Sequence, residues 1–260
     1  MMNKFIYCLL IFVLLIISIN TSLSASCLDN YTILTEDFPP FQYIDKKGKL
    51  TGSSVELLDL IFKELKSTKT IKDIKIYPWS RGYKLIRTKP NIMLFAMSRT
   101  PERNKLFKWA GPQIRTVYCL IAKKDKKIKI KSLKDITKYR IGVIRDDIGE
   151  LLLIQKGIPQ NKLYRTAKAE SIIKQLENDW IDVWSYESTP AKWFIKNEGI
   201  DPNKYEIVYV IKEMWSSYAF SKDTPDLVIS KVNKAWKKIR KSSEVKKIIK
   251  KYNYPPGHLR

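Results

Sequence analysis

Short runs of apolar residues alternate with amphipathic segments over most of this chain, and this alternation constrains its fold more than any other feature. Residues 92–95 and 140–144 have the length and apolar content of buried strands, whereas residues 55–65 carry apolar side chains at helical spacing. Strands that alternate with helices are typical of α/β folds with largely parallel sheets flanked by helices. The pattern starts again near Arg140, so we expect two similar lobes rather than one sheet.

The same periodicity predicts individual elements along the chain. Strands are expected at residues 31–35, 74–77, 92–95, 117–122, 140–144, 162–165, 181–186, 207–211 and 218–221. Helices are expected at residues 55–65, 78–86, 150–155 and 169–178, with one that begins at Thr100 and is closed by Gly111-Pro112, and two basic helices at residues 228–239 and 245–252. Ligands of such sheets bind beyond the carboxyl ends of the strands, where many polar residues of this chain lie.

A cluster of polar residues follows the predicted strand at residues 92–95. Thr100 has the preferred chemistry of a helix N-cap, and Pro101 is favoured at the first helical position. A helix that begins at the end of a strand offers free backbone N–H groups, and Arg103 adds a planar cationic fork suited to a carboxylate. These residues indicate either an anion-binding corner or an ordinary strand-to-helix connection with solvated charges.

Residues 1–25 have the composition of a secretory signal peptide, because a basic residue is followed by an apolar stretch at residues 5–19 and then by small residues. Cleavage is expected just before Ser26 or Cys27, and the mature protein is expected in the periplasm. An uncleaved membrane anchor is the alternative.

Two cysteines, Cys27 and Cys119, remain after such processing. In an oxidising compartment they could form a single disulfide, although the sequence does not show that they approach each other. Cys27 is alternatively a lipidated N-terminus. The lipid anchor is less favoured, because Ser24 stands where a lipoprotein signal normally has leucine.

The formal net charge of +23 invites a nucleic-acid interpretation. Export argues against it, as does the spread of lysines over the whole chain, so no nucleic-acid partner is expected. The densest basic run, residues 231–251, keeps apolar side chains at helical spacing, which is typical of helices with a solvated basic face. Attraction to anionic lipid or surface polymers is a weaker alternative.

The sequence lacks the residues of several reaction classes. His258 is the single histidine, and no nucleotide-binding glycine loop is present. Histidine-based catalysis and zinc clusters are therefore excluded, and no metal or cofactor is expected. The adjacent acids Asp146 with Asp147, and Glu36 with Asp37, are usual in solvated turns and helix caps. This inventory favours a binding protein over an enzyme.

Aromatic and charged side chains near the predicted strand ends are the candidates for ligand binding. They are Phe38, Trp79, Arg81, Arg99, Arg103, Asp147 and Glu187. Each has a purely structural alternative. The aromatic rings can belong to the core and the arginines to the solvated surface, and Glu187 can cap the helix that starts at Thr189 and Pro190.

Several short motifs occur in order over almost the whole mature chain. They are Glu36-Asp-Phe-Pro-Pro-Phe41, Gly48-Lys-Leu-Thr-Gly52, Val55-Glu-Leu-Leu58, Pro78-Trp79, Thr100-Pro-Glu-Arg103, Gly142-Val143, Asp182-Val-Trp-Ser-Tyr-Glu187, Val232-Asn-Lys-Ala235 and Lys250-Lys-Tyr252. Together they resemble the family 3 extracellular solute-binding proteins, the amino-acid-type periplasmic receptors of ATP-driven (ABC) importers.

The resemblance implies the two-lobe, type II fold of periplasmic binding proteins, with the ligand cleft between the lobes. Lobe 1 would comprise residues 26–118 and 214–260, where the chain returns with its basic helices, and lobe 2 residues 119–213. Two crossing segments, near residues 117–120 and 213–219, would join the lobes.

The resemblance also implies roles for individual residues. Arg103, in the Thr-x-x-Arg motif, would bind the α-carboxylate of the ligand together with the backbone N–H groups of Ala96 and Ser98. Phe38 would stack on the ligand, and Glu187 would receive its α-amino group. Arg99 is then only a secondary candidate.

Two departures from the family pattern bear on the ligand. Phe95 and Ala96 stand where members commonly have serine or glycine, and Asp146-Asp147-Ile148 replaces the usual hydroxyl-bearing anion loop. The change removes hydroxyl donors and adds negative charge. It favours a cationic or differently shaped polar solute over an ordinary α-amino acid.

We therefore expect a monomeric periplasmic receptor, not an enzyme. It would capture a small polar solute, an amino acid or related compound, by hinge closure and deliver it to an ABC permease in the inner membrane. The alternatives are a lyase or dehydratase on the same two-lobe fold, and a sensory binding protein without a permease.

Overall fold

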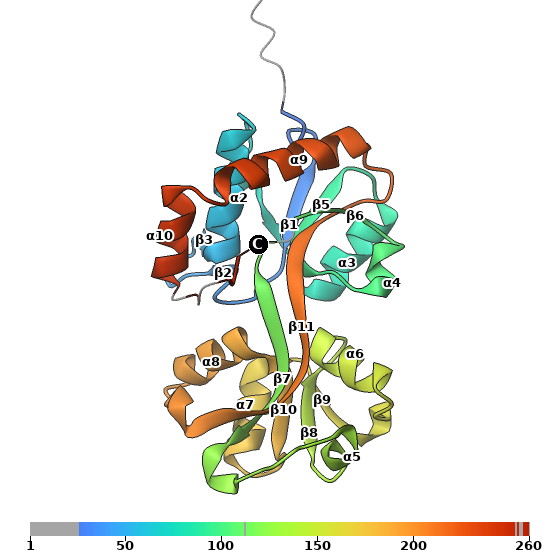
Figure 1. The fold of residues 1–260 in the computed structure, drawn as a ribbon, viewed down its shortest axis with the longest axis vertical. Coiled ribbons are helices and arrows are strands. Elements are labelled where there is room, and N and C mark those ends of the chain that lie inside the picture. The colour runs from blue at the N-terminus through green and yellow to red at the C-terminus, as the bar shows by residue number, and fades with distance from the viewer. Residues whose placement is uncertain (1–25, 112, 253, 255–256, 260) are drawn as a thin grey trace, which may run out of the picture.

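The computed structural model describes residues 26–111, 113–252, 254 and 257–259 of the chain. Figure 1 shows two lobes, one above the other, with two long strands, β7 (Arg115–Lys123) and β11 (Tyr205–Phe220), running between them. The predicted signal peptide lies outside the described residues. No helix in the described part of the chain is long and apolar enough to span a membrane.

Lobe 1, the upper lobe in Figure 1, contains the amino-terminal and carboxyl-terminal parts of the described chain. Its elements are β1 (Thr32–Thr35), β2 (Tyr43–Ile44), β3 (Leu50–Thr51), α2 (Ser53–Glu64), η1 (Ile71–Asp73), β4 (Lys75–Ile76), α3 (Trp79–Thr88), β5 (Ile92–Ser98), α4 (Pro101–Asn104), β6 (Lys108–Ala110), α9 (Asp226–Ile239) and α10 (Ser243–Lys251). The strand order is β4-β1-β5-β11, with β6 also paired to β11. β1 is parallel to β4 and β5, and β11 is antiparallel to β5.

Helices cover both faces of the lobe 1 sheet, which explains why its strands read as continuous apolar runs. In β5, Met93 and Phe95 pack into the core cluster that contains α2 and α9, whereas Leu94 and Met97 pack on the side of α3. The amphipathic character predicted for the basic helices is confirmed, since residues such as Trp236 of α9 are buried while the lysines lie outside.

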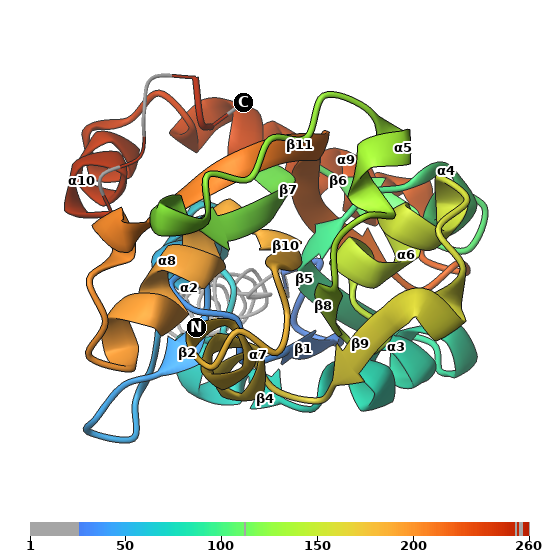
Figure 2. The same cartoon turned by 90° about the horizontal axis from the view of Figure 1, so that it is seen from below.

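Lobe 2 has the strand order β11-β7-β10-β8-β9, in which β10, β8 and β9 are parallel. Its elements, besides the two long strands, are η2 (Lys124–Lys126), α5 (Leu133–Ile136), β8 (Ile141–Ile144), α6 (Ile148–Gln155), η3 (Gln160–Lys162), β9 (Leu163–Thr166), α7 (Ala169–Glu177), β10 (Val183–Glu187), α8 (Ser188–Asn197) and η4 (Pro202–Lys204). Figure 2 shows α7 and α8 on one side of this sheet and α5 and α6 on the other, in agreement with the two core clusters of the lobe.

A glycine sets how closely α6 approaches the lobe 2 sheet. A Cβ atom at Gly149 would lie 2.5 Å from the backbone oxygen of Ser185 in β10. The hydroxyl of Ser185 in turn donates to the backbone oxygen of Gly149 at 2.9 Å. The first turn of α6 is therefore fixed directly against β10, next to the space between the lobes.

These features confirm the predicted fold class, an α/β two-lobe architecture with mostly parallel sheets flanked by helices. The predicted crossing segments, residues 117–120 and 213–219, fall within β7 and β11, the two strands that run between the lobes (Figure 1). The boundaries predicted at residues 118/119 and 213/214 stay a prediction.

The helix predicted between Thr100 and Gly111 is much shorter than expected. It ends at Asn104, and residues Lys108–Ala110 instead form β6, which pairs antiparallel with β11. The prediction was wrong because the aromatic and apolar side chains of this segment complete the lobe 1 sheet. Trp109, for example, lies opposite Ala219.

The last two predicted strands, at residues 207–211 and 218–221, are one continuous strand, β11. The segment between them carries exposed polar residues such as Lys212 and Glu213, which interrupt the apolar pattern. It nevertheless stays extended, because Lys212 and Glu213 pair with Tyr118 and Val117 of β7.

The suggested disulfide between Cys27 and Cys119 is absent, and both cysteines are free. Cys27 packs against the main core of lobe 1, whereas Cys119 lies within the α7–α8 side of lobe 2. The Sγ atom of Cys119 donates to the backbone oxygen of Tyr186 at 3.7 Å. The two thiols thus belong to the cores of different lobes.

We expect iodoacetamide at pH 7.5 to leave Cys119 unmodified in the native protein, because burial raises the pKa of this thiol to about 12. After denaturation without a reductant, both Cys27 and Cys119 should be alkylated, which peptide mass mapping would show. The matched control includes a reductant and should give the same result. Alkylation that requires the reductant would contradict the free thiols.

Candidate functional site

A small cavity lies between the lobes, beyond the carboxyl ends of β1 and β5. Side chains from both lobes line it: Glu36, Phe38, Trp79, Ala96, Met97, Ser98, Arg103, Tyr118, Asp147 and Ile148. Its volume of about 20 Å³ is on the order of what one water molecule requires. Two ring contacts between the lobes accompany this closed arrangement, Phe38 with Tyr186 at 5.9 Å and Tyr43 with Trp193 at 5.6 Å.

Arg103 is the cation of this cavity and is only 6 % exposed. Thr100 caps α4 as predicted, since its hydroxyl accepts from the backbone N–H of Arg103 at 3.2 Å. The Nη1 group donates to the backbone oxygen of Ser98 at 3.0 Å, and the guanidinium lies 4.8 Å from the ring centre of Trp79. The other guanidinium N–H groups have no hydrogen-bond acceptor among the described residues.

The rings around Arg103 fix the orientation of its side chain. The guanidinium also lies 5.4 Å from the ring centre of Tyr83, and Trp79 and Tyr83 stack on each other at 5.3 Å. A guanidinium that lies against two aromatic rings keeps its charge and its planar fork while it loses little further freedom on binding. Arg103 is therefore prepared to accept an anionic group.

Ala96 has an unusual backbone conformation at the edge of the cavity. Its φ of 59° lies in the left-handed region, which costs an alanine roughly 1 kcal/mol or more. The pairing of β5 with β11 shifts register between Ser217 and Ala219, opposite this part of β5. A bulge of this kind redirects the strand, so that Ala96, Met97 and Ser98 all border the cavity.

Two carboxylates, one from each lobe, border the same cavity. Burial, with the added charge of Asp147, raises the pKa of Glu36 to about 8, although Arg103 acts in the opposite direction. Burial also raises the pKa of Asp147 to about 6, even though its side chain caps α6 by accepting from the backbone N–H of Gly149 at 2.8 Å. Two acidic groups therefore share the cavity with Arg103, and they come from facing lobes.

Glu187 occupies a different environment from these two acids. It is fully buried, and its carboxylate accepts from the backbone N–H groups of Val117 at 2.9 Å and Thr189 at 2.7 Å. Burial raises its pKa to about 7. Glu187 therefore caps α8, which is the structural role that the sequence analysis gave as its alternative. It is not among the residues that line the cavity. Its role towards a ligand stays a prediction.

Arg81 and Arg99 lie outside the cavity. Arg81 is exposed, with its guanidinium 4.1 Å from the ring centre of Tyr77. Arg99 is also exposed, and its Nε donates to the side chain of Asn104 at 2.6 Å. The other predicted residues, Phe38, Trp79, Ala96, Ser98, Arg103 and Asp147, all line the cavity.

Sequence reasoning assigned no binding role to four of the lining residues. Glu36 enters the sequence analysis as one of a pair of loop acids and as the start of a family motif, Ile148 enters only as part of the replaced loop, and Met97 and Tyr118 have no part in it. Tyr118 comes from the crossing strand β7, and its hydroxyl lies 3.3 Å from that of Ser98. A signal for Glu36 and Ile148 was present, since both follow predicted strands at their carboxyl ends.

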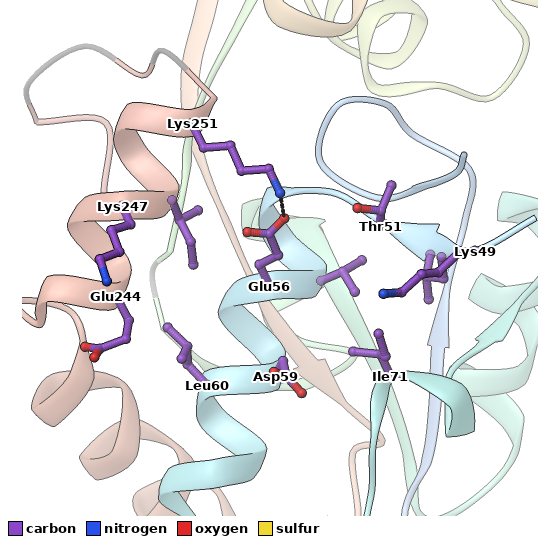
Figure 3. A pocket seen from close by; sticks show the side chains of 12 residues that line it. Lys49, Thr51, Glu56, Asp59, Leu60, Ile71, Glu244, Lys247 and Lys251 are labelled. Carbon is purple, nitrogen blue, oxygen red and sulfur yellow. Dashed lines mark hydrogen bonds and ion pairs between the residues drawn. The ribbon is translucent and has the colours of Figure 1, made fainter. Parts of the chain in front are cut away.

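A separate groove of about 570 Å³ lies on lobe 1 between α2, β3 and α10 (Figure 3). Its walls mix apolar side chains such as Leu60 and Ile71 with charged ones, and Lys251 forms an ion pair with Glu56 at its edge. None of the predicted site residues lines this groove. Within the described residues, no group of three or more potential metal ligands is present.

Residues 32–255 match the model of the family described as bacterial extracellular solute-binding proteins, family 3. The chain belongs to this family, and its function is the binding of a solute. The cavity between the two lobes, with its buried arginine and facing carboxylates, is the candidate site for that solute.

Curated relatives are binding proteins of similar length. The chain is 24 % identical over 221 residues to a probable histidine-binding protein of Neisseria gonorrhoeae, covering 83 % of this chain and 80 % of the relative. It is 26 % identical over 222 residues to the arginine-binding extracellular protein ArtP of Bacillus subtilis, covering 83 % and 82 %.

Solved structures share the fold. One is an ABC uptake transporter substrate-binding protein from Streptococcus pneumoniae with bound histidine, with a TM-score of 0.73, 19 % identity, and coverage of 87 % of this chain and 94 % of that one. Another is a histidine kinase sensor domain with similarity to periplasmic binding proteins, with a TM-score of 0.74, 19 % identity, and coverage of 85 % and 95 %.

We expect Glu36→Gln to stabilise the protein at pH 8.5 much more than at pH 4.5. Because the pKa of Glu36 is raised from 4.5 to about 8, the native state binds its proton more tightly than the unfolded chain. The stability that the native state gains from this proton is fully present below about pH 4.5 and is lost as the pH rises through about 8. Glutamine removes the titration, so the gain at pH 8.5 should be a few kcal/mol, at roughly 1.4 kcal/mol for each unit of the pKa difference.

Differential scanning calorimetry at both pH values measures this effect. The matched control is Glu206→Gln, the same chemical change at an exposed position of β11. It should show no comparable difference between the two pH values. Equal changes of the melting temperature at pH 4.5 and 8.5 for Glu36→Gln would contradict the assigned titration.

Proposed function

We propose that the protein is a periplasmic receptor for a small solute that carries both an anionic and a cationic group, an amino acid or a related compound. The observation that supports this proposal is that Arg103 and the carboxylates of Glu36 and Asp147 border one cavity between the lobes. A zwitterionic solute satisfies both signs of charge at once.

The anionic group of the solute would bind Arg103. A buried guanidinium with free N–H groups forms strong, charge-assisted hydrogen bonds with a carboxylate. The backbone at Ala96 and Ser98 borders the same space, in agreement with the role that the family resemblance implies for its N–H groups.

The cationic group would lie between Glu36 and Asp147. An ammonium or guanidinium group there would compensate two carboxylates that are otherwise brought together in a poorly hydrated space. The names of the curated relatives, which bind histidine and arginine, agree with a solute of this charge. We therefore favour a solute that places a cationic group, such as an α-ammonium, at this position.

Binding would proceed by opening and closing of the lobes. A cavity of about 20 Å³ is too small for an amino acid, so the solute must enter when the lobes are apart. β7 and β11 would form the hinge, between a lobe of residues 26–118 and 214–260 and a lobe of residues 119–213. The loaded monomer would then dock on an ABC permease, and the solute would leave unchanged, as expected of a receptor rather than an enzyme.

We expect Arg103→Ala to weaken solute binding at least 100-fold, because it removes a buried charge-assisted contact worth roughly 3 kcal/mol or more. The measurement is isothermal titration of the purified, ligand-stripped protein with a panel of amino acids and small amines. Arg99→Ala is the matched control, since Arg99 lies outside the cavity, and it should bind with native affinity. A panel without a binder, or a binder unaffected by Arg103→Ala, would refute the proposal.

A further inference from the structure

A second and much larger space lies beside the cavity, on the other side of Arg103. This α3–α6 groove has a volume of about 710 Å³ and runs between α3 and α4 of lobe 1 and α6 of lobe 2. Its lining residues on the inner side are Trp79, Tyr83, Arg103, Ile148, Leu151 and Leu152. Pockets for small organic ligands usually have volumes of roughly 300–1,000 Å³.

The groove and the cavity are neighbours that share a wall. Trp79, Arg103 and Ile148 line both of them. These side chains come from both lobes, so the wall between the two spaces opens when the lobes separate. A solute bound to Arg103 therefore has room for its bulk in the groove, whereas the cavity on the side of Glu36 has room for about one water molecule.

The inner part of the groove is apolar. Trp79 and Tyr83 contribute ring faces from α3, and Ile148, Leu151 and Leu152 contribute aliphatic surface from α6. Leu151 is 37 % exposed, although it belongs to a helix that is apolar on nearly all sides. Such a helix is normally covered on every side, so its surface towards α3 lacks a partner among the described residues.

The outer end of the groove is polar. Exposed charged and polar side chains of both signs line it: Lys84, Arg87, Thr88, Glu102, Asp146 and Gln155. The space thus has a cationic inner end at Arg103, an apolar middle and a solvated mouth. An elongated solute with a polar head and an unbranched apolar chain matches this order of surfaces.

We propose that the α3–α6 groove is a binding subsite for an apolar chain of the solute whose head is held by Arg103. This inference rests on the proposed receptor function and narrows its ligand to an elongated, amphipathic compound. The chain would lie between α3 and α6, and it would contact both lobes and contribute to their closure.

The test uses amino acids with one common head and unbranched side chains of increasing length: alanine, norvaline, norleucine and 2-aminooctanoate. Isothermal titration should show Kd falling by about fourfold for each added methylene that enters the groove. A Kd that is independent of chain length, or that rises with it, would overturn the subsite.

A variant links this dependence to the groove. In Leu151→Gln the ratio of the alanine Kd to the 2-aminooctanoate Kd should fall about fivefold, because apolar contact with the chain is lost. Leu151→Met, which keeps the apolar volume, should restore the native ratio. Leu227→Gln is the matched control, since Leu227 is 66 % exposed on α9, away from both spaces. An unchanged ratio in Leu151→Gln would overturn the assignment.

The result also separates this inference from the receptor proposal. Any binder that depends on Arg103, combined with no effect of chain length, overturns the subsite and leaves the receptor standing. If neither the series of unbranched amino acids nor the panel of amino acids and small amines contains a compound whose binding depends on Arg103, the subsite and the receptor proposal are both overturned.

Discussion

The strand β11 is the element on which both lobes depend. It pairs with β5 in lobe 1 and with β7 in lobe 2, so one strand carries the hydrogen-bond ladders of both sheets. The lobes can therefore change their relative position only by bending of β7 and β11 where these strands cross between them. The carboxyl end of β5 and the N-terminus of α6 meet beside this crossing, which brings Arg103 and Asp147 to one cavity.

The chemistry of that cavity follows from the removal of charges from water. The rings of Trp79 and Tyr83 lie beside the guanidinium of Arg103, and a poorly hydrated cation requires nearby negative charge. Glu36 and Asp147 supply it, but burial keeps the pKa of each above its ordinary value. Because the pKa of Glu36 lies near 8, this acid is largely protonated at neutral pH, and Asp147 carries most of the negative charge near Arg103. A solute that brings both a carboxylate for Arg103 and a positive group for the acids adds no net charge, and its positive group would favour ionisation of Glu36.

The fold and most of the cavity were predictable from sequence, because strand ends in parallel sheets converge. Phe38, Trp79, Arg103 and Asp147 could be placed on this basis alone. The length of β11 could not, since its exposed middle lacks apolar alternation. The environment of Glu187 could not be predicted either, because a carboxylate that caps a helix and one that faces a ligand look the same in sequence. The α3–α6 groove could not be predicted, because it forms where the two lobes meet and local sequence patterns carry no information on that contact.

The placement of Glu36 and Asp147 on opposite lobes has a consequence for the empty receptor. Above about pH 8, where both groups are ionised, shutting the lobes would bring two like charges together out of water, and their repulsion would favour the open form of an unloaded molecule. A positive group on the bound solute would offset this repulsion and stabilise the closed form. Below about pH 8, where Glu36 takes up a proton, this repulsion would be relieved without any solute. As the pH falls, closed but empty molecules would therefore become more frequent relative to open ones.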